Sequence, residues 1–278
     1  MAVHKTIYEY YLHQLRNCES YIEQCKVHAE PELVHELRLS IKKLRAFNLL
    51  ATRLNLPESG DYQSLIDGVK NMFSLAGQIR DTQVQIYMLA DCKELTGVSY
   101  SLFHKWLLRR ERTKISQLCK CKYESTSESN PASTGNHKDS LIPLPDAVTV
   151  FSTAKLLLDE MHLKAQKLAT GNITDDNLHE IRKTAKQIRY ILTILSIIYP
   201  DFQFQRITHD ELKEIENAVG NWHDNLVRIE FIDRFLKKIE NQNEVILLKY
   251  RGLTTFGLAS LHEAYENACQ EVKLKLLK

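Results

Sequence analysis

The segment that decides the fold is His35-Glu-Leu-Arg-Leu-Ser-Ile-Lys-Lys-Leu-Arg45. At 3.6 residues per turn, four of its basic side chains fall on a stripe about 80° wide, with apolar residues on the opposite side. The stripe consists of His35, Arg38, Lys42 and Arg45, and the apolar face of Val34, Leu37, Ile41 and Leu44. This spacing predicts an amphipathic helix that buries one face and presents a basic one.

The same pattern recurs in the second half of the chain. His179-Glu-Ile-Arg-Lys-Thr-Ala-Lys-Gln-Ile-Arg189 repeats the spacing, with the stripe His179, Arg182, Lys186 and Arg189 and the apolar face Leu178, Ile181, Ala185 and Ile188. A second echo aligns Gly77-Gln-Ile-Arg-Asp81-Thr-Gln-Val84 with Gly220-Asn-Trp-His-Asp224-Asn-Leu-Val227, in the same order. We therefore expect one domain over 1–278, made of two four-helix repeats at 1–122 and 147–278 and a linker at 123–146.

Composition agrees with an all-α protein of long helices. The 278 residues include only 9 glycines and 6 prolines, less than half of the ~12% that soluble proteins average. Sheets need turn residues at every reversal, so sandwiches, barrels and Rossmann-type folds are excluded. Apolar periodicity predicts helices at 3–28, 32–55, 61–92, 98–121, 147–169, 175–199, 205–241 and 254–277, with Gly220 a weak point in the seventh. Close helix packing is the expected reason for glycines 77 and 220.

The same sequence argues against membranes, export and disulfides. No apolar run reaches the ~20 residues of a membrane span, and His4, Lys5 and Glu9 interrupt the place of a signal peptide. The six cysteines lack the spacing of a metal site or of a disulfide framework, and we expect free thiols. These features predict a cytoplasmic protein.

The two stripes point to an anionic ligand. Each window, 35–45 and 179–189, holds four Lys or Arg against one Glu, whereas the whole chain has a net charge of only +2. Arg38 with Lys42, and Arg182 with Lys186, place like charges four residues apart, where a solvated face usually alternates signs. One such stripe alone is explained equally well as a solvated surface. Guanidinium, ammonium and imidazole donors together suit phosphate oxygens, so two stripes favour a phosphate-like ligand.

Two further features have alternative explanations. Lys105, Arg109 and Arg112 form another candidate basic strip, for which a solvated helix face is an equally good account. Asp81 and Asp224 could cap a helix, pair with the basic stripe or hold a divalent ion, and we favour a structural ion pair. No cofactor is expected.

The two ordered echoes resemble the CHAD family, the conserved histidine α-helical domain, over nearly the whole chain. The motifs that carry the resemblance are HELRLSIKKLR at 35–45, LAGQIRDTQV at 75–84, LHEIRKTAKQIRY at 178–190 and VGNWHD at 219–224. The resemblance implies two four-helix halves related by a pseudo-two-fold axis, with a central basic groove that binds inorganic polyphosphate. It implies that the stripe residues His35, Arg38, Lys42, Arg45, His179, Arg182, Lys186 and Arg189 contact the anion, with Lys43 and Lys183 as further candidates. The ExExK signature of the triphosphate tunnel domains to which such domains are often fused is missing, which indicates a stand-alone copy.

The leading hypothesis is a non-catalytic polyphosphate-binding module, an adaptor or a granule-associated protein. A nucleic-acid-binding protein is the first alternative, because the release of counterions favours binding to any phosphate chain. A metal-dependent phosphohydrolase is the second, although no P-loop, carboxylate cluster or activated nucleophile is recognisable. In either binding role we expect His35 and His179 to take up protons when the anion binds.

Overall fold

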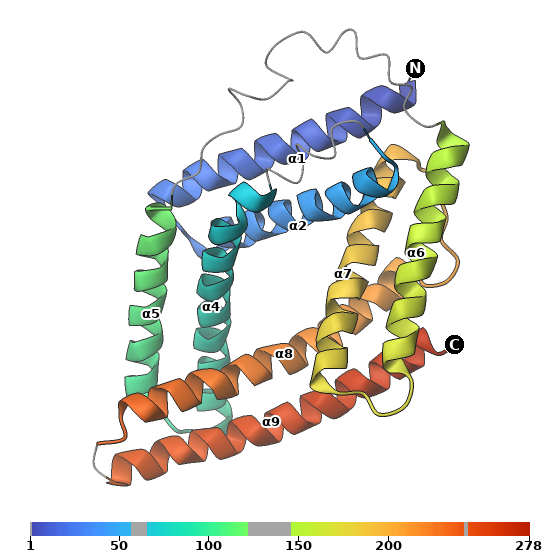
Figure 1. Ribbon diagram of the computed structural model, residues 1–278. Coiled ribbons are helices and arrows are strands. Elements are labelled where there is room, and N and C mark those ends of the chain that lie inside the picture. Colours follow the sequence, from blue (N-terminus) through green and yellow to red (C-terminus); the bar gives the residue numbers. More distant parts are fainter. Residues whose placement is uncertain (1, 57–65, 122–145, 242–243) are drawn as a thin grey trace. The chain divides into compact units, whose positions relative to one another are not determined.

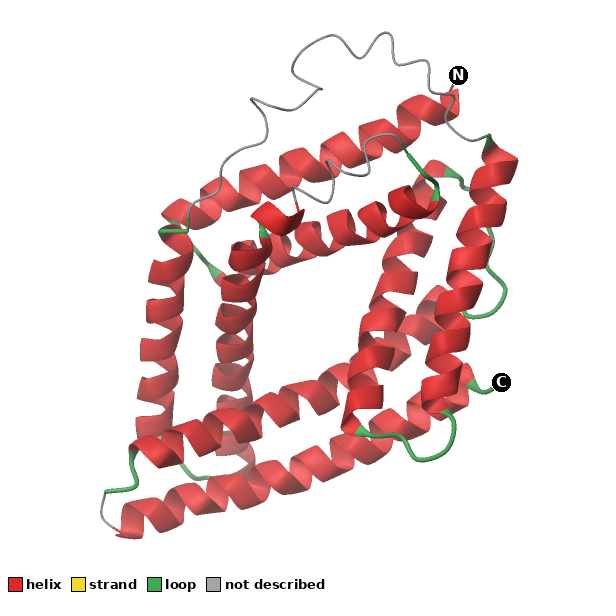
Figure 2. Ribbon diagram, viewed as in Figure 1, coloured by secondary structure: helices red, strands yellow, loops and turns green. Residues whose placement is uncertain are grey.

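A computed structural model describes residues 2–56, 66–121, 146–241 and 244–278, and these residues form helices and connecting turns without a strand (Figures 1 and 2). The helices are α1 (Ala2–Val27), α2 (Pro31–Arg53), α4 (Lys70–Thr96), α5 (Ser101–Cys119), α6 (Ala147–Ala169), α7 (Asp175–Ile198), α8 (His209–Lys238) and α9 (Glu244–Leu276). The all-α prediction is confirmed. The predicted linker 123–146 and the start of the helix predicted at 61–92 lie largely outside the described residues.

The helix predicted at 205–241 is present as α8, which continues through Gly220, the expected weak point. A mid-helix glycine costs only about 1 kcal/mol, and burial of Val219 and Trp222 beside it stabilises the helix by more. Helix α9 begins at Glu244 rather than near 254, because Tyr250 and Leu253 are buried and extend its apolar face toward the N-terminus.

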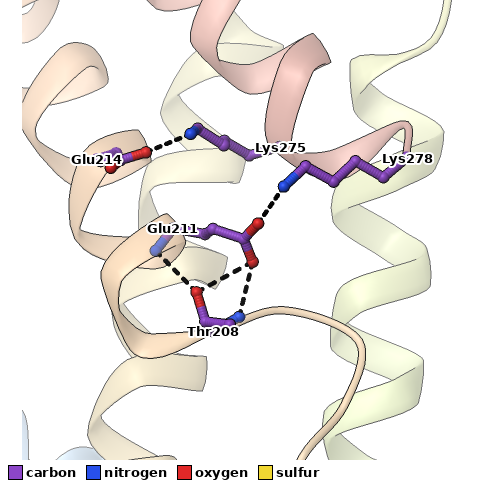
Figure 3. A network of polar contacts seen from close by, with 5 residues as sticks. All are labelled: Thr208, Glu211, Glu214, Lys275 and Lys278. Carbon is purple, nitrogen blue, oxygen red and sulfur yellow. Dashed lines mark hydrogen bonds and ion pairs between the residues drawn. The ribbon is translucent and has the colours of Figure 1, made fainter.

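Helix α8 begins at a complete capping box. The Thr208 hydroxyl accepts a hydrogen bond from the Glu211 backbone N–H, and the Glu211 carboxylate accepts one from the Thr208 N–H. Two lysines from the end of the chain join this network: Lys278 pairs with Glu211 and Lys275 with Glu214 (Figure 3). These contacts attach the C-terminus of α9 to the first turns of α8 and hold the pKa of Glu211 at about 2.

The described chain divides into two compact units. Unit 1 contains Met1–Gly77, Lys114–Glu160 and Tyr190–Phe204, and unit 2 contains Gln78–Thr113, Met161–Arg189 and Gln205–Lys278. Each unit therefore takes residues from both predicted repeats, and α4, α5, α6 and α7 each contribute to both units. The two-repeat organisation stays a prediction.

Each unit has its own apolar core. In unit 1, Phe47 of α2 stacks on Tyr11 of α1 with ring centroids 5.3 Å apart, as these two helices pack along each other. In unit 2, Phe103 of α5, Phe235 of α8 and Tyr250 of α9 form one buried cluster. Within the described ranges no helix combines the length and apolar character needed to cross a membrane.

Candidate functional site

Helix α7 presents its predicted stripe within unit 2. Thr174 precedes the helix and accepts a hydrogen bond from the Asn177 N–H, and Asp175 and Asp176 occupy the first turn, where the helix dipole favours acids. The predicted apolar face, Leu178, Ile181, Ala185 and Ile188, is buried throughout. This burial fixes the rotation of the helix about its axis and so determines where the basic stripe lies.

Arg189 is held by an acidic residue of α8, whereas Arg182 is half-buried and interacts electrostatically with several acids. Glu216 of α8 binds Arg189 through two ion pairs, 2.5 Å from Nε and 3.0 Å from Nη2. Burial lowers the pKa of Arg182, while the charges of Asp224, Asp81 and Glu216 raise it. The Arg189 guanidinium therefore occupies a defined position before any ligand binds.

His179 lies at the N-terminal end of the same stripe. Its ring centroid is 5.7 Å from that of His223 on α8. Burial lowers the pKa of His179 below its ordinary value, and the charges of Lys183 and Arg182 lower it further. Lys183 itself is exposed and pairs with Glu180 at 2.8 Å. The surroundings of the imidazole therefore disfavour its charged form, and a nearby anion would favour it.

The second echo contributes an acidic pair to unit 2. Burial and the charge of Asp81 raise the pKa of Asp224, whereas Arg182, Lys186 and Arg80 lower it. Asp224 thus interacts electrostatically with the α7 stripe, and the structural ion pair stays a prediction. Among the residues that the structure describes, no group of three or more His, Cys, Asp or Glu is placed to hold a metal ion.

Helix α2 presents the first stripe within unit 1. Its predicted apolar face, Val34, Leu37, Ile41 and Leu44, is buried, whereas His35 is exposed and Lys42 and Lys43 are half-buried. Arg38 and Arg45 place their guanidinium groups over one ring, that of Phe73 on α4, at 4.9 and 4.1 Å from its centroid. Arg38 also donates a hydrogen bond of 3.3 Å to the Phe73 carbonyl.

Gly77 makes room for Arg38. A Cβ atom at this position would lie 2.6 Å from Arg38 Nη1, closer than any contact allows. The expected close approach is thus present, but to a side chain. At Gly220 a Cβ would meet nothing within 4 Å, so the packing explanation predicted there was wrong.

The third candidate strip faces solvent. Lys105, Arg109 and Arg112 of α5 are all exposed. Their neighbour Arg110 is half-buried and lies over the ring of Phe231, 4.9 Å from its centroid. The structure thus provides a fixed position for Arg110 rather than for the predicted strip.

Phe73 and Glu216 contact the stripes but were not predicted from the sequence. Phe73 lies one helical turn before Gly77, and Glu216 one turn before Gly220, so both flank the segments of the second echo. Nothing in the local pattern assigns either residue to a basic partner on another helix. The six cysteines are free, as predicted.

The α2 stripe belongs to unit 1 and the α7 stripe to unit 2, so the shared groove stays a prediction. What the geometry supplies is two basic helix faces, with Arg38 and Arg45 on α2 and Arg189 on α7 fixed by partners from other helices. Fixed guanidinium groups are the usual receptors for phosphate and carboxylate oxygens.

Comparison with known proteins adds the following findings. A family model described as "CHAD domain" matches residues 9–233. The crystal structure of the CHAD domain from the plant Ricinus communis is similar with a TM-score of 0.65 and 17% sequence identity, over 95% of this chain and 89% of that chain. No curated protein matches the sequence.

Proposed function

The chain belongs to the CHAD domain family, and from that premise we propose that it binds inorganic polyphosphate through the basic faces of α2 and α7. The proposed role is that of a non-catalytic module, an adaptor or granule-associated protein of the cytoplasm. The observation that carries the proposal is the pair of basic stripes, each opposite a fully buried apolar face.

Preorganisation supports binding of a flexible anion. Phe73 orients Arg38 and Arg45, and Glu216 orients Arg189, so these side chains lose little rotamer freedom when a phosphate chain arrives. Binding by many such charges releases counterions, which makes the affinity strongly dependent on salt.

The aromatic residues near the stripes favour polyphosphate over nucleic acid. Tyr190, next to the α7 stripe, is 7% exposed, and the Phe73 ring lies under two guanidinium groups. Neither ring presents the open face on which a base would stack.

A salt titration with a matched pair of double variants tests the proposal. In Lys42→Gln/Lys186→Gln we expect the slope of log K against log salt to become shallower by about 0.7 for each lysine, since a single flexible chain releases about that many ions per contacted phosphate. The control, Lys155→Gln/Lys213→Gln, removes two exposed lysines outside the stripes and should bind like the wild type. Equal slopes of log K against log salt for the two double variants would show that the stripes do not contact the anion.

Competition between anions tests the choice of ligand. At fixed salt, long-chain polyphosphate should displace labelled polyphosphate at lower phosphate concentration than RNA or double-stranded DNA does. Stronger competition by RNA or DNA would establish the nucleic-acid alternative instead.

A further inference from the structure

A pocket of about 430 Å³ opens in unit 2. Its walls come from α4, α8 and α9, and none of its lining residues belongs to α7. The volume lies within the range of about 300–1,000 Å³ that is typical of small-molecule sites. The pocket is therefore large enough for a metabolite and is independent of the polyphosphate proposal.

Arg228 is the buried charged group of this pocket. Its side chain is only 9% exposed, and it makes no hydrogen bond or ion pair with another described residue. Burial lowers the pKa of Arg228, and the charges of Cys92, Asp91 and Asp224 raise it. A guanidinium stays protonated at neutral pH, and burial of a charge that has no hydrogen-bonded partner is costly. An anionic group of a ligand would supply the missing partner.

The rim of the pocket carries the opposite charge. Asp91 and Glu263 line it and are exposed, so the lining holds two carboxylates and one guanidinium. Two carboxylates repel a polyanion but attract an ammonium group. The charge pattern thus fits a ligand with one negative and one positive group.

Uncharged groups complete the lining. Asn225 is 4% exposed, and its Nδ2 donates to the carbonyl and Oδ1 oxygens of Asn221, at 2.9 and 3.2 Å. These two bonds fix the amide orientation and leave Asn225 Oδ1 without a hydrogen bond among the described residues. Met88, Leu95 and Phe256 provide an apolar wall. Polar groups at defined positions beside an apolar wall are the usual make-up of a metabolite site.

We propose that this pocket binds a small zwitterion of the α-amino-acid class, with its carboxylate on Arg228, its ammonium group between Asp91 and Glu263, and its side chain against Phe256. The proposal does not depend on polyphosphate binding, because the two sites share no residue.

Calorimetric titration of the full chain with free leucine, methionine and phenylalanine tests the proposal. We expect at least one of them to bind. Its methyl ester, which lacks the carboxylate charge, and its N-acetyl form, which lacks the ammonium charge, should each bind at least tenfold more weakly. No heat of binding with any of the three free amino acids, or equal binding of the N-acetyl form, would overturn the assignment of a zwitterion.

Two variants with matched controls locate the site. Arg228→Met keeps most of the side-chain volume and should reduce amino-acid affinity at least tenfold, whereas Arg234→Met, on the exposed side of α8, should not. Asp91→Asn changes an exposed residue of the pocket lining and provides the test if Arg228→Met fails to fold. It should weaken binding of the free amino acid but not of its N-acetyl form. Wild-type affinity for the amino acid in folded Arg228→Met, or in Asp91→Asn, would contradict the proposal. Both variants should bind polyphosphate like the wild type.

Discussion

Gly77 and Gly220 occupy corresponding places in the second echo, but their surroundings differ. A side chain at Gly77 would meet the tip of Arg38, whereas one at Gly220 would meet nothing within 4 Å. A guanidinium tip can move, so an alanine at 77 would displace Arg38 from Phe73 rather than disrupt the helix. The difference between the two glycines leads to a paired prediction.

We expect Gly220→Ala to raise the free energy of unfolding by about 0.5–1 kcal/mol, the helix preference of alanine over glycine, and to leave polyphosphate affinity unchanged. Gly77→Ala should gain less stability, because it disturbs the cation–π contact and the hydrogen bond of Arg38, worth about 0.5–1.5 kcal/mol each, and it should weaken polyphosphate binding. Urea unfolding followed by circular dichroism, together with affinity measurements, checks both. Identical behaviour of the two variants would show that Gly77 makes no special room for Arg38.

His179 carries a prediction about pH. Its pKa lies below the ordinary value of about 6.5, so the unfolded chain binds this proton at higher pH than the folded chain does. Its contribution to stability is therefore complete above pH ~6.5 and is lost as the pH falls through the pKa of the folded state. Stability measured from pH 7.5 to 5 should decline less steeply in His179→Gln than in the wild type.

Binding of polyphosphate should raise the pKa of His179, whereas its surroundings in the folded protein lower it. A phosphate chain on the α7 stripe favours the imidazolium, so binding near pH 6.5 should take up protons and strengthen as the pH falls. Calorimetry in two buffers of different ionisation enthalpy measures this uptake, and His179→Gln should reduce it. Equal apparent enthalpies in both buffers for the wild type would rule out proton uptake.

At the scale of the element, the capping box of α8 is the clearest local determinant of where a helix begins. Thr208→Ala removes the side-chain acceptor of the Glu211 N–H and should cost about 1 kcal/mol of stability. The matched control is Thr255→Ala, an exposed mid-helix threonine of α9, where alanine should be neutral or slightly stabilising. Thermal unfolding of the two variants distinguishes them, and equal effects would mean that the box contributes no more than an ordinary surface threonine.

Helix α7 shows how an element's orientation follows from its sequence. Every residue of its predicted apolar face is buried, and its basic stripe then lies where the neighbouring acids of α8 reach it. Helix α8 shows the limit of such reasoning. Gly220 is tolerated within this helix because burial of the surrounding core residues offsets the small cost of a glycine.

At the scale of the whole molecule, the binding-module proposal predicts no turnover. With magnesium or manganese present, purified protein should bind long-chain polyphosphate without shortening it, as measured by gel electrophoresis of the recovered chains. An added polyphosphatase serves as the positive control. Shortening over many turnovers that is lost in Asp81→Asn or Asp224→Asn would establish a metal-dependent hydrolase and refute the module.

The sequence by itself determined the all-α class and the two opposed faces of α2 and α7. Both follow from local periodicity, because a helix turns by a fixed angle per residue and apolar burial selects its inner face. The stripe residues could therefore be named without a structure. The same is true of the free cysteines, whose spacing gave no sign of pairing.

Only the tertiary structure decided which partners those residues meet. Phe73 under Arg38 and Arg45, Glu216 against Arg189 and the pocket around Arg228 each join residues of different helices. The rotation and register of one helix against another depend on side-chain packing across the interface. No local pattern encodes that packing, and this is why the basic stripes were predictable whereas the groups that fix them, and the second pocket, were not.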